Sequence, residues 1–353
     1  MNSSDSFAWL AQPAFTIDQQ AQEQAQTRQQ QLTKPAGSLG RLESIAQQFA
    51  GYQGLQCAQL NQIKIVVFAG DHGVCQQGVS AFPQAVTAQM VANFANGGAA
   101  ISVLSRYLQA DLHVVNVGTV EALPAMTGVL DRRVASGTQD MSETQAMTEQ
   151  QCAQALAAGR EQVETIERGI CHLCVGGEMG IGNSTSAAAL YCTLLDQRAA
   201  MTVGPGTGLD AAGVTLKQQV VERALRRHPQ AFDYPLQALQ CLGGFEIAAL
   251  CGFYIAAAQK GVPILIDGFI SSAAALVAVA INPTVAPWFL YSHSSAEPGH
   301  QLALQKLQVQ PLLDLNMRLG EGSGAALAVP LLQAALRLHA EMATFADAGV
   351  ANG

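Results

Sequence analysis

The stretch IKIVVFAGDHG, residues 63–73, decides the fold class of this chain of 353 residues. Ile63 to Phe68 is a short, mostly apolar run rich in β-branched residues, which is typical of a strand buried in a parallel sheet. Ala69 to Gly73 is a polar turn with two glycines, and it ends the strand. Similar runs follow at Leu112–Val117, Ile170–Val175, Met201–Val203, Ile264–Ile266 and Trp288–Tyr291.

Helical patterns lie between most of these runs. They cover residues 84–107, 184–195, 211–227, 244–260 and 271–281. Short apolar strands that alternate with helices predict an α/β fold, with a mostly parallel, six-stranded, Rossmann-like sheet covered by helices on both faces. Ahead of the first strand, residues 17–31 predict a surface helix, Lys34–Gly40 breaks it, and residues 41–52 predict a second helix.

Composition excludes several classes of function. Hydrophobic residues make up 49% of the chain and charged residues 12%, so most of it must pack into a core. The formal charge of −8 argues against a nucleic-acid-binding surface, since the densest basic cluster is only Arg223, Arg226, Arg227 and His228. The first residues lack the pattern of a signal peptide, and the most apolar stretch, 269–281, is too short to span a bilayer. We therefore expect a cytoplasmic protein without a membrane partner.

The eight cysteines leave two interpretations open. Cys171 and Cys174 have the CxxC spacing of redox and zinc sites. They lie, however, in a run that predicts a buried strand, and no second CxxC exists, which favours plain buried thiols. Reduced cysteines fit a cytoplasmic enzyme.

Polar residues concentrate where the predicted strands end. Because parallel strands present their carboxyl ends at one edge of the sheet, where ligands bind, we expect these segments to meet. They are the Asp71–His72 turn, the loop Gly176–Thr185, the turn Gly204–Gly208, Asp267–Gly268 and Ser292–His300.

Two carboxylates stand between glycines. Glu321 lies in Met317–Gly324, directly before an apolar helical run, and Glu178 lies in Gly177–Gly180. A glutamate on such a turn is well placed to accept a proton, because glycine lets the backbone crowd a ligand. The alternative for Glu321 is a solvated acid at a helix start, which helix N-termini favour in any case.

The glycines match no familiar nucleotide motif. The Gly-x-x-x-x-Gly-Lys-Ser/Thr motif is absent, and no Gly-x-Gly-x-x-Gly opens the first βα unit. The turn Gly204–Gly208 is a moderate phosphate-loop signal, although Pro205 lacks an N–H donor. Lys217 is either a phosphate partner for this turn or part of a solvated helix face.

Metal binding is not predicted. His72, His293 and His300 lie near Asp71 and Asp267 in the predicted site, yet their spacings match no metal template. Asp71 and His72 more plausibly orient a polar ligand or fix their turn through hydrogen bonds to the backbone. We expect no metal and no cofactor.

Several weak motifs, taken together and in order, carry a resemblance. They are Lys34–Gly40 with Arg41–Glu43, Gly70–Gly73 with Gly78–Ser80, Gly97–Ala100, the Glu178 loop, Gly243–Glu246, Asp267–Phe269, Ser292–Glu297 and Arg318–Gly324. From about Leu32 to Met342 the chain resembles the nicotinate-nucleotide–dimethylbenzimidazole phosphoribosyltransferases, which build the lower-ligand nucleotide of cobalamin. The rival interpretation is another nucleotide glycosyl transfer, of the phosphorylase or nucleosidase type, on the same scaffold.

The resemblance implies a fold, a reaction and a homodimer. It implies a small helical domain from residues 1–60 and 325–353 and a large catalytic α/β domain from residues 61–324. The reaction moves the 5-phosphoribosyl group of nicotinate mononucleotide to 5,6-dimethylbenzimidazole, with inversion at C1′. Glu321 corresponds to the family's general base and Glu178 to its second active-site glutamate.

The motifs and the resemblance together predict the residues that bind the two substrates. Pro205 stands where relatives often carry an arginine, and Phe82 where some carry a polar residue, so the chain departs from the family pattern at the phosphate turn and in the base-binding segment. The predicted binding residues are Asp71, His72, Ser80, Phe82, Gly176, Gly177, Asn183, Ser184, Thr185, Gly204, Gly206, Thr207, Gly208, Lys217, Asp267, Ser292, Ser295, Leu319, Gly320 and Ser323.

Overall fold

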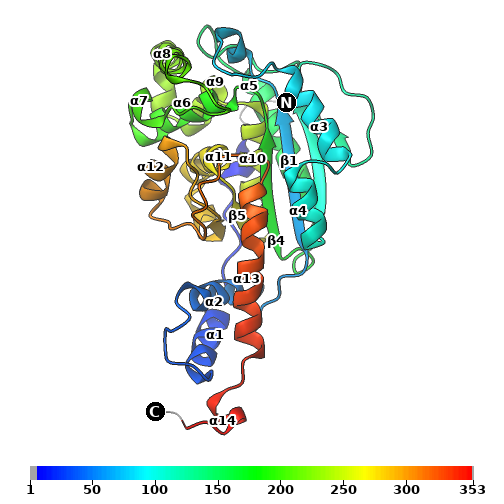
Figure 1. Ribbon diagram of the computed structural model, residues 1–353, viewed down its shortest axis with the longest axis vertical. Helices are drawn as coiled ribbons and strands as arrows, with labels where there is room; N and C mark the ends of the chain where they lie inside the picture. Colours follow the sequence, from blue (N-terminus) through cyan, green and yellow to red (C-terminus); the bar gives the residue numbers. More distant parts are fainter. Residues whose placement is uncertain (1–5, 352–353) are drawn as a thin grey trace.

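Six parallel strands form the centre of the computed structural model, which describes residues 6–351 (Figure 1). The strands are hydrogen-bonded in the order β3-β2-β1-β4-β5-β6, and every pair is parallel. The predicted α/β class and the six-stranded parallel sheet are confirmed. The strands are β1 Ile63–Gly70, β2 Asp111–Gly118, β3 Val129–Asp131, β4 Leu173–Met179, β5 Ile264–Ile266 and β6 Phe289–Tyr291.

The direction of strand addition reverses between β1 and β4. From β1 the chain moves outward to β2 and β3, returns to β4 beside β1, and continues to β5 and β6 on the other side. Such a reversal opens a crevice beyond the carboxyl ends of the two central strands. Asp71 follows the end of β1, and Glu178 lies at the end of β4.

Helices cover both faces of this sheet. Across the described residues the helices are α1 Gln19–Gln31, α2 Arg41–Gln53, α3 Ala85–Ala95, α4 Ala100–Leu108, α5 Glu149–Glu164, α6 Asn183–Leu195, α7 Ala199–Thr202, α8 Ala211–Arg227, α9 Pro235–Leu242, α10 Phe245–Gln259, α11 Phe269–Ile281, α12 Pro298–Leu307, α13 Ser323–Glu341 and α14 Phe345–Ala348. Short 3₁₀ turns lie at Ala8–Ala11, Gly73–Gln77, Pro229–Phe232 and Pro283–Trp288.

Two neighbouring glycines of β4 show which elements lie on which face. Successive residues of a strand point to opposite faces. A side chain on Gly176 would meet Leu250 and Tyr254 of α10, whereas one on Gly177 would meet the backbone of Glu321, just before α13. Helix α10, with α5 packed on it, therefore covers one face, and α13 with α3 and α4 covers the other.

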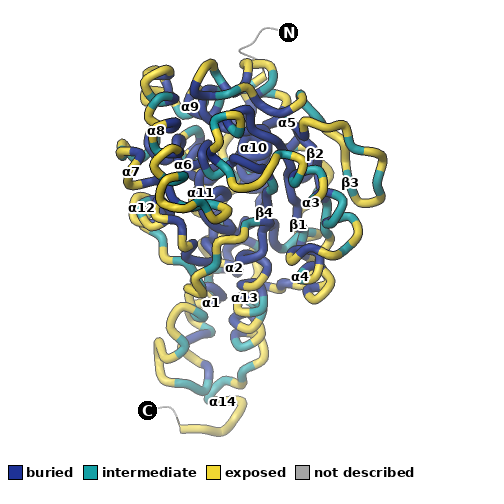
Figure 2. The backbone as a smooth tube through the Cα atoms, turned by 45° about the horizontal axis from the view of Figure 1, so that its top comes forward, coloured by how far each residue is buried: buried dark blue, intermediate teal, exposed yellow. Residues whose placement is uncertain are grey.

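One long helix connects the sheet to a narrow helical projection. Helix α13 starts beside the carboxyl end of β4 and continues away from the sheet to pack against α2, which packs in turn against α1 (Figure 1). Arg28 of α1 donates hydrogen bonds to the carbonyls of His339 and Ala340 near the end of α13. Figure 2 shows much of this projection exposed, whereas the central strands β1 and β4 are buried. The division into domains at residues 60 and 325 stays a prediction.

Some predicted elements were wrong in detail. Met201–Val203 is not a strand, since Ala199–Thr202 forms the short helix α7. The sixth strand is instead β3, a three-residue edge strand that is partly exposed and therefore lacks an apolar signature. The helix predicted over 84–107 is two helices, because Gly97 adopts a φ of 79° between α3 and α4.

The Gly176–Thr185 segment also differs from its prediction. Gly176 to Met179 belong to β4, which runs from Leu173 to Met179, so the strand continues past the predicted end at Val175.

None of the helices that the structure describes is both long and apolar enough to cross a membrane.

Candidate active site

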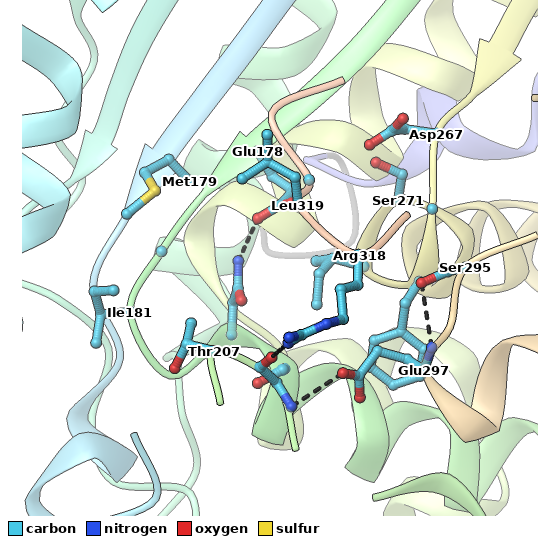
Figure 3. A pocket seen from close by; sticks show the side chains of 18 of the residues that line it. Glu178, Met179, Ile181, Thr207, Asp267, Ser271, Ser295, Glu297, Arg318 and Leu319 are labelled. Carbon is cyan, nitrogen blue, oxygen red and sulfur yellow. Dashed lines mark hydrogen bonds between the residues drawn. The ribbon is translucent and has the colours of Figure 1, made fainter. Parts of the chain in front are cut away.

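A cavity of about 490 Å³ lies beyond the carboxyl ends of β4, β5 and β6 (Figure 3). That volume is in the range of small-molecule sites. Its wall comes from segments far apart in the sequence, which the sheet brings together. The lining residues are Phe82, Glu178, Met179, Gly180, Ile181, Asn183, Ser184, Gly206, Thr207, Asp267, Gly268, Phe269, Ile270, Ser271, His293, Ser295, Glu297, Arg318, Leu319 and Gly320.

Glu178 presents a buried carboxylate to this cavity. The amide of Asn183, the first residue of α6, donates a hydrogen bond to its Oε2 atom. Burial raises the pKa of Glu178 to about 8, and the neighbouring carboxylates of Glu246, Asp267 and Glu321 add to the rise. Near neutral pH this side chain therefore carries a proton in the free enzyme.

Glu321 sits on a tight turn opposite β4. Its φ is 64°, between glycines at 88° and 84°, a backbone region that side chains other than glycine rarely adopt. Its Oε2 atom accepts a hydrogen bond of 3.3 Å from the backbone N–H of Ile101 in the first turn of α4. Burial raises the pKa of Glu321, while this backbone bond lowers it. Its carboxylate is not part of the cavity wall.

Asp267 links the cavity to the start of α13. Its Oδ1 atom accepts a hydrogen bond of 2.8 Å from the N–H of Ala325. The same atom lies 3.7 Å from Nδ1 of His293, a cavity residue that also lies 3.1 Å from the hydroxyl of Ser292. Burial raises the pKa of Asp267, and His293 opposes the rise. These contacts fix the turn after β6 against α13.

The turn Gly204–Gly208 follows α7 and faces the cavity through Gly206 and Thr207. The N–H of Gly206 donates to Oε1 of Glu297 at 3.0 Å, and its carbonyl accepts from Nη1 of Arg318 at 3.0 Å. Figure 3 shows the Arg318 side chain extended toward this turn. The turn is thus held by a carboxylate on one side and a guanidinium on the other.

Lys217 lies behind that turn. Its Nζ donates to the hydroxyl of Ser184 at 2.8 Å and to the carbonyl of Gly204 at 3.3 Å. The side chain is only 1% exposed and is not part of the cavity wall. Burial lowers the pKa of Lys217 to about 8, and Glu297 opposes this. In this state Lys217 supports the cavity wall through Ser184.

His72 and Asp71 lie beneath the cavity. Nε2 of His72 is 2.7 Å from Oε1 of the fully buried Glu246, and Asp71 accepts a hydrogen bond of 2.8 Å from the N–H of Val120. The carbonyl of His72 accepts a hydrogen bond of 2.7 Å from the side chain of Gln84. Gln84 follows shortly after Phe82, so this contact holds the segment that brings Phe82 to the cavity.

Comparison with known proteins identifies the family. A family model described as "Phosphoribosyltransferase" matches residues 15–350. A nicotinate-nucleotide–dimethylbenzimidazole phosphoribosyltransferase from Pseudomonas putida is 56% identical over 345 residues, 98% of each chain. The chain belongs to this family. A relative of the same name from Pseudomonas fluorescens is 55% identical over 352 residues, which are 100% of this chain and 99% of the relative.

A solved structure agrees with this assignment. The structure of the same-named enzyme from Thermus thermophilus superposes with a TM-score of 0.89 at 42% sequence identity, covering 96% of this chain and 100% of the other. The resemblance predicted from the motifs is confirmed, and the protein is an enzyme of the transferase class. The alternative of a phosphorylase or nucleosidase finds no support among these relatives.

In this phosphoribosyltransferase fold, the sequence-predicted site residues fall into two groups. The first group lines the cavity: Phe82, Glu178, Asn183, Ser184, Gly206, Thr207, Asp267, Ser295, Leu319 and Gly320. The second group lies behind or beside the wall: Asp71, His72, Ser80, Gly176, Gly177, Thr185, Gly204, Gly208, Lys217, Ser292, Glu321 and Ser323. For these residues a direct substrate contact stays a prediction.

Other lining residues were missed although they adjoin predicted ones. His293, Glu297 and Arg318 stood inside motifs that the sequence had already marked, and only the side-chain directions in the fold single them out. The apolar lining residues follow the ends of β4 and β5. The sequence gives no signal for them except that they stand next to predicted site residues. The missed residues are Met179, Gly180, Ile181, Gly268, Phe269, Ile270, Ser271, His293, Glu297 and Arg318.

The structure also places the CxxC pair. The Sγ atoms of Cys171 and Cys174 lie 3.9 Å apart at the amino-terminal end of β4, remote from the cavity edge of that strand. Across residues 6–351, no group of three or more His, Cys, Asp or Glu side chains has the arrangement of a metal site.

Proposed function

We propose that this enzyme transfers the 5-phosphoribosyl group of nicotinate mononucleotide to 5,6-dimethylbenzimidazole, giving α-ribazole 5′-phosphate and nicotinate for the nucleotide loop of cobalamin. One observation supports it above the others: the wall of the cavity combines apolar side chains with hydroxyl groups and charged side chains, and Glu178 is among them. Met179, Ile181 and Leu319 suit a flat aromatic base, whereas Thr207 and Arg318 suit a phosphorylated ribose (Figure 3).

The chemistry of the donor defines what the enzyme must supply. The ring nitrogen of nicotinate mononucleotide is quaternary, so it leaves with the electron pair of the C1′–N bond as a neutral pyridine and needs no acid. A benzimidazole nitrogen attacks C1′ from the opposite face, which inverts the configuration from β to α. The proton on the second benzimidazole nitrogen then becomes acidic and needs a base.

Two glutamates divide these tasks in the proposed mechanism. Positive charge develops on the ribose as the bond breaks, as in glycoside hydrolysis, and Glu178 stabilises it from the cavity wall. Glu321 accepts the benzimidazole proton. Supporting this role, its Oε1 atom has no hydrogen-bond partner among the described residues, while Oε2 is held by Ile101. General base catalysis of this kind contributes about 10²–10⁴-fold to the rate.

The other lining residues are proposed to position the two substrates. Phe82 and Leu319, both exposed, would cover the faces of the incoming base. Ser184, Thr207 and Ser295 offer hydroxyl groups to the ribose and the phosphate. We do not propose a metal or a cofactor, since the quaternary leaving group requires neither.

Turnover with defined substrates tests the function. The purified protein is incubated with nicotinate mononucleotide and a panel of benzimidazoles, purines and phenols, and products are separated by chromatography and identified by mass and NMR. We expect an α-configured ribazole phosphate and one nicotinate per transfer. Nicotinate release that requires phosphate or water but no base would support the phosphorylase or nucleosidase alternative and overturn the proposal.

We further propose that the enzyme is a cytoplasmic homodimer. The exposed face of the packed pair α4 and α13 carries Val103 and Tyr107 on one helix and Leu327 and Leu331 on the other. Exposed apolar side chains on two packed helices suit a second copy related by a twofold axis. Sedimentation of the wild type and of a Tyr107→Lys, Leu331→Lys variant tests it. A monomeric wild type, or a variant that still dimerises, would contradict this placement.

A further inference from the structure

Cys171 and Cys174 form a close pair of thiols at the edge of the sheet opposite the cavity. Their Sγ atoms lie 3.9 Å apart at the amino-terminal end of β4, whereas Glu178 lies near the other end of that strand. All eight cysteines of the chain lie within residues 6–351, and the other six form no thiol–thiol hydrogen bond there. The transfer reaction proposed above uses neither thiol of this pair.

The two thiols differ in their access to solvent. Cys171 is partly exposed and precedes β4, so the buried strand predicted over Ile170–Val175 begins only at Leu173. Cys174 is the second residue of β4 and is 0% exposed. Its N–H donates to the carbonyl of Pro263 at 2.9 Å, which holds its backbone against the segment ahead of β5. A reagent from solution therefore reaches Cys171 first, and reaches Cys174 only through Cys171.

The surroundings also divide the protons between the two sulfur atoms. The hydrogen bond with the Cys174 thiol lowers the pKa of Cys171; burial opposes this, and the charge of Lys64 on the neighbouring strand β1 adds to the lowering. The same hydrogen bond and complete burial raise the pKa of Cys174. Cys171 is thus the thiol that ionises more readily, and the thiolate is the form that attacks a disulfide.

Closing a disulfide between these cysteines requires only a local movement. The new ring encloses two residues, His172 and Leu173. The sulfur atoms must approach from 3.9 Å to the bonded distance of about 2.05 Å. Gly169, two residues before Cys171, has a φ of 82°, and a side chain there would meet no atom within 4 Å. The turn ahead of β4 therefore has room to carry Cys171 toward Cys174.

We propose that Cys171 and Cys174 are a site of reversible thiol–disulfide exchange with a small-molecule disulfide such as glutathione disulfide. The Cys171 thiolate attacks one sulfur of the external disulfide, forms a mixed disulfide and releases one thiolate, which takes up a proton. Cys174 then gives up its proton and attacks the Cys171 sulfur, which expels the second external thiol. Two protein thiols are oxidised to one disulfide, and one external disulfide is reduced to two thiols.

Mass mapping after oxidation tests this site. The reduced, native enzyme is incubated with glutathione disulfide in the absence of substrates. The remaining thiols are then alkylated with iodoacetamide in denaturant, and the protein is digested with trypsin. The peptide Gly169–Arg198 contains Cys171, Cys174 and Cys192. We expect it to lose two alkylatable thiols while Cys192 stays alkylated, and dithiothreitol should restore both. A peptide that keeps all three thiols, or that retains glutathione on Cys171, would overturn the proposal.

Two variants test the order of the steps. Cys174→Ser removes the second thiol and should trap glutathione on Cys171, whereas Cys171→Ser should leave the buried Cys174 free of adduct. In denaturant this difference should vanish, because it depends on burial. Cys57→Ser removes another partly exposed cysteine and is the matched control, which should form the cross-link as the wild type does. Equal adducts on the remaining cysteine of the two native variants would contradict the assignment of Cys171 as the attacking thiol. No substrate is present, so these outcomes do not depend on the proposed function.

Discussion

Replacing Glu178 by glutamine should change activity in a way that depends on pH. The substitution keeps the size of the side chain and an oxygen that can accept the hydrogen bond from Asn183. It removes the negative charge that we propose to stabilise the ribosyl cation. The pKa of Glu178 is about 8 in the free enzyme, because of burial and of the neighbouring carboxylates. The charge is therefore scarce at pH 6 and abundant at pH 9.

The magnitude follows from that pKa. With a pKa of about 8, roughly 1% of the free enzyme has an ionised Glu178 at pH 6, so kcat/KM of the wild type should rise about 100-fold up to its plateau. Loss of a single electrostatic stabiliser costs about 10²–10³-fold. The wild type should thus exceed Glu178→Gln by at least ~10²-fold at pH 9 and by only a few-fold at pH 6. In the donor complex the cationic ring lowers the pKa, so kcat should rise at lower pH than kcat/KM.

Steady-state kinetics from pH 6 to pH 9 with both proteins provide the assay. The donor's phosphate titrates near pH 6, and its effect cancels in the ratio of the two proteins because both receive the same donor.

The carboxyl group of Glu178 also affects stability: the folded protein keeps its proton up to about pH 8, whereas the ordinary pKa of a glutamate is 4.5. Its contribution to the free energy of unfolding therefore falls between pH 4.5 and 8, by up to about 5 kcal/mol, and Glu178→Gln should flatten that slope. In the kinetic assay, a ratio of the wild-type kcat/KM to that of Glu178→Gln that stays constant with pH would refute the role of Glu178 as a charged stabiliser.

Three further changes test other parts of the site. Glu321→Gln should leave donor binding nearly intact and lower turnover by at least ~10²-fold, measured by calorimetry and kinetics; wild-type turnover would exclude it as the base. Lys217→Ala should weaken the use of nicotinate mononucleotide and of nicotinate riboside alike in steady-state kinetics, because Lys217 holds Ser184 and Gly204 without lining the cavity; a loss confined to the mononucleotide would instead show a direct phosphate contact. Gly177→Ala should destabilise the fold by about 1–3 kcal/mol in denaturant unfolding, since its Cβ would collide with the Glu321 carbonyl; an unchanged midpoint would mean that this contact relaxes freely.

The sheet and its ligand edge could be predicted from local pattern. A buried parallel strand such as Ile63–Phe68 must be apolar along its length, and its carboxyl end must change to polar residues if a ligand binds there. Edge strand β3 carries no such constraint, because it is partly exposed, so its sequence resembles a loop. Met201–Val203 shows the converse error: a short apolar run that resembles a strand belongs to the end of a short helix, in which Thr202 is buried and Met201 is exposed.

Side-chain direction is the part that sequence pattern could not supply. Lys217 and Arg318 are both basic residues near the Gly204–Gly208 turn, and the pattern favoured the lysine on a regular helix. In the fold, α8 buries the lysine under Ser184, whereas the irregular segment before Glu321 extends the arginine into the cavity. The difference depends on packing between elements that are about a hundred residues apart, and no local periodicity records it.

Glu178 and Glu321 differ in their chemistry because they reach the carboxyl end of β4 from different elements. Glu178 belongs to β4 itself, so it is enclosed by the sheet and by three other carboxylates, and its proton stays until about pH 8. Glu321 reaches the same region from outside, because Gly177 in β4 leaves room for its backbone, and the N–H of Ile101 at the start of α4 favours its ionised form. Burial raises the pKa of Glu321 too, and the Ile101 N–H opposes that rise, so this hydrogen bond supports the carboxylate form that a proton acceptor needs. Glu178 gains its charge when the cationic donor binds, which is when a stabilising charge is needed.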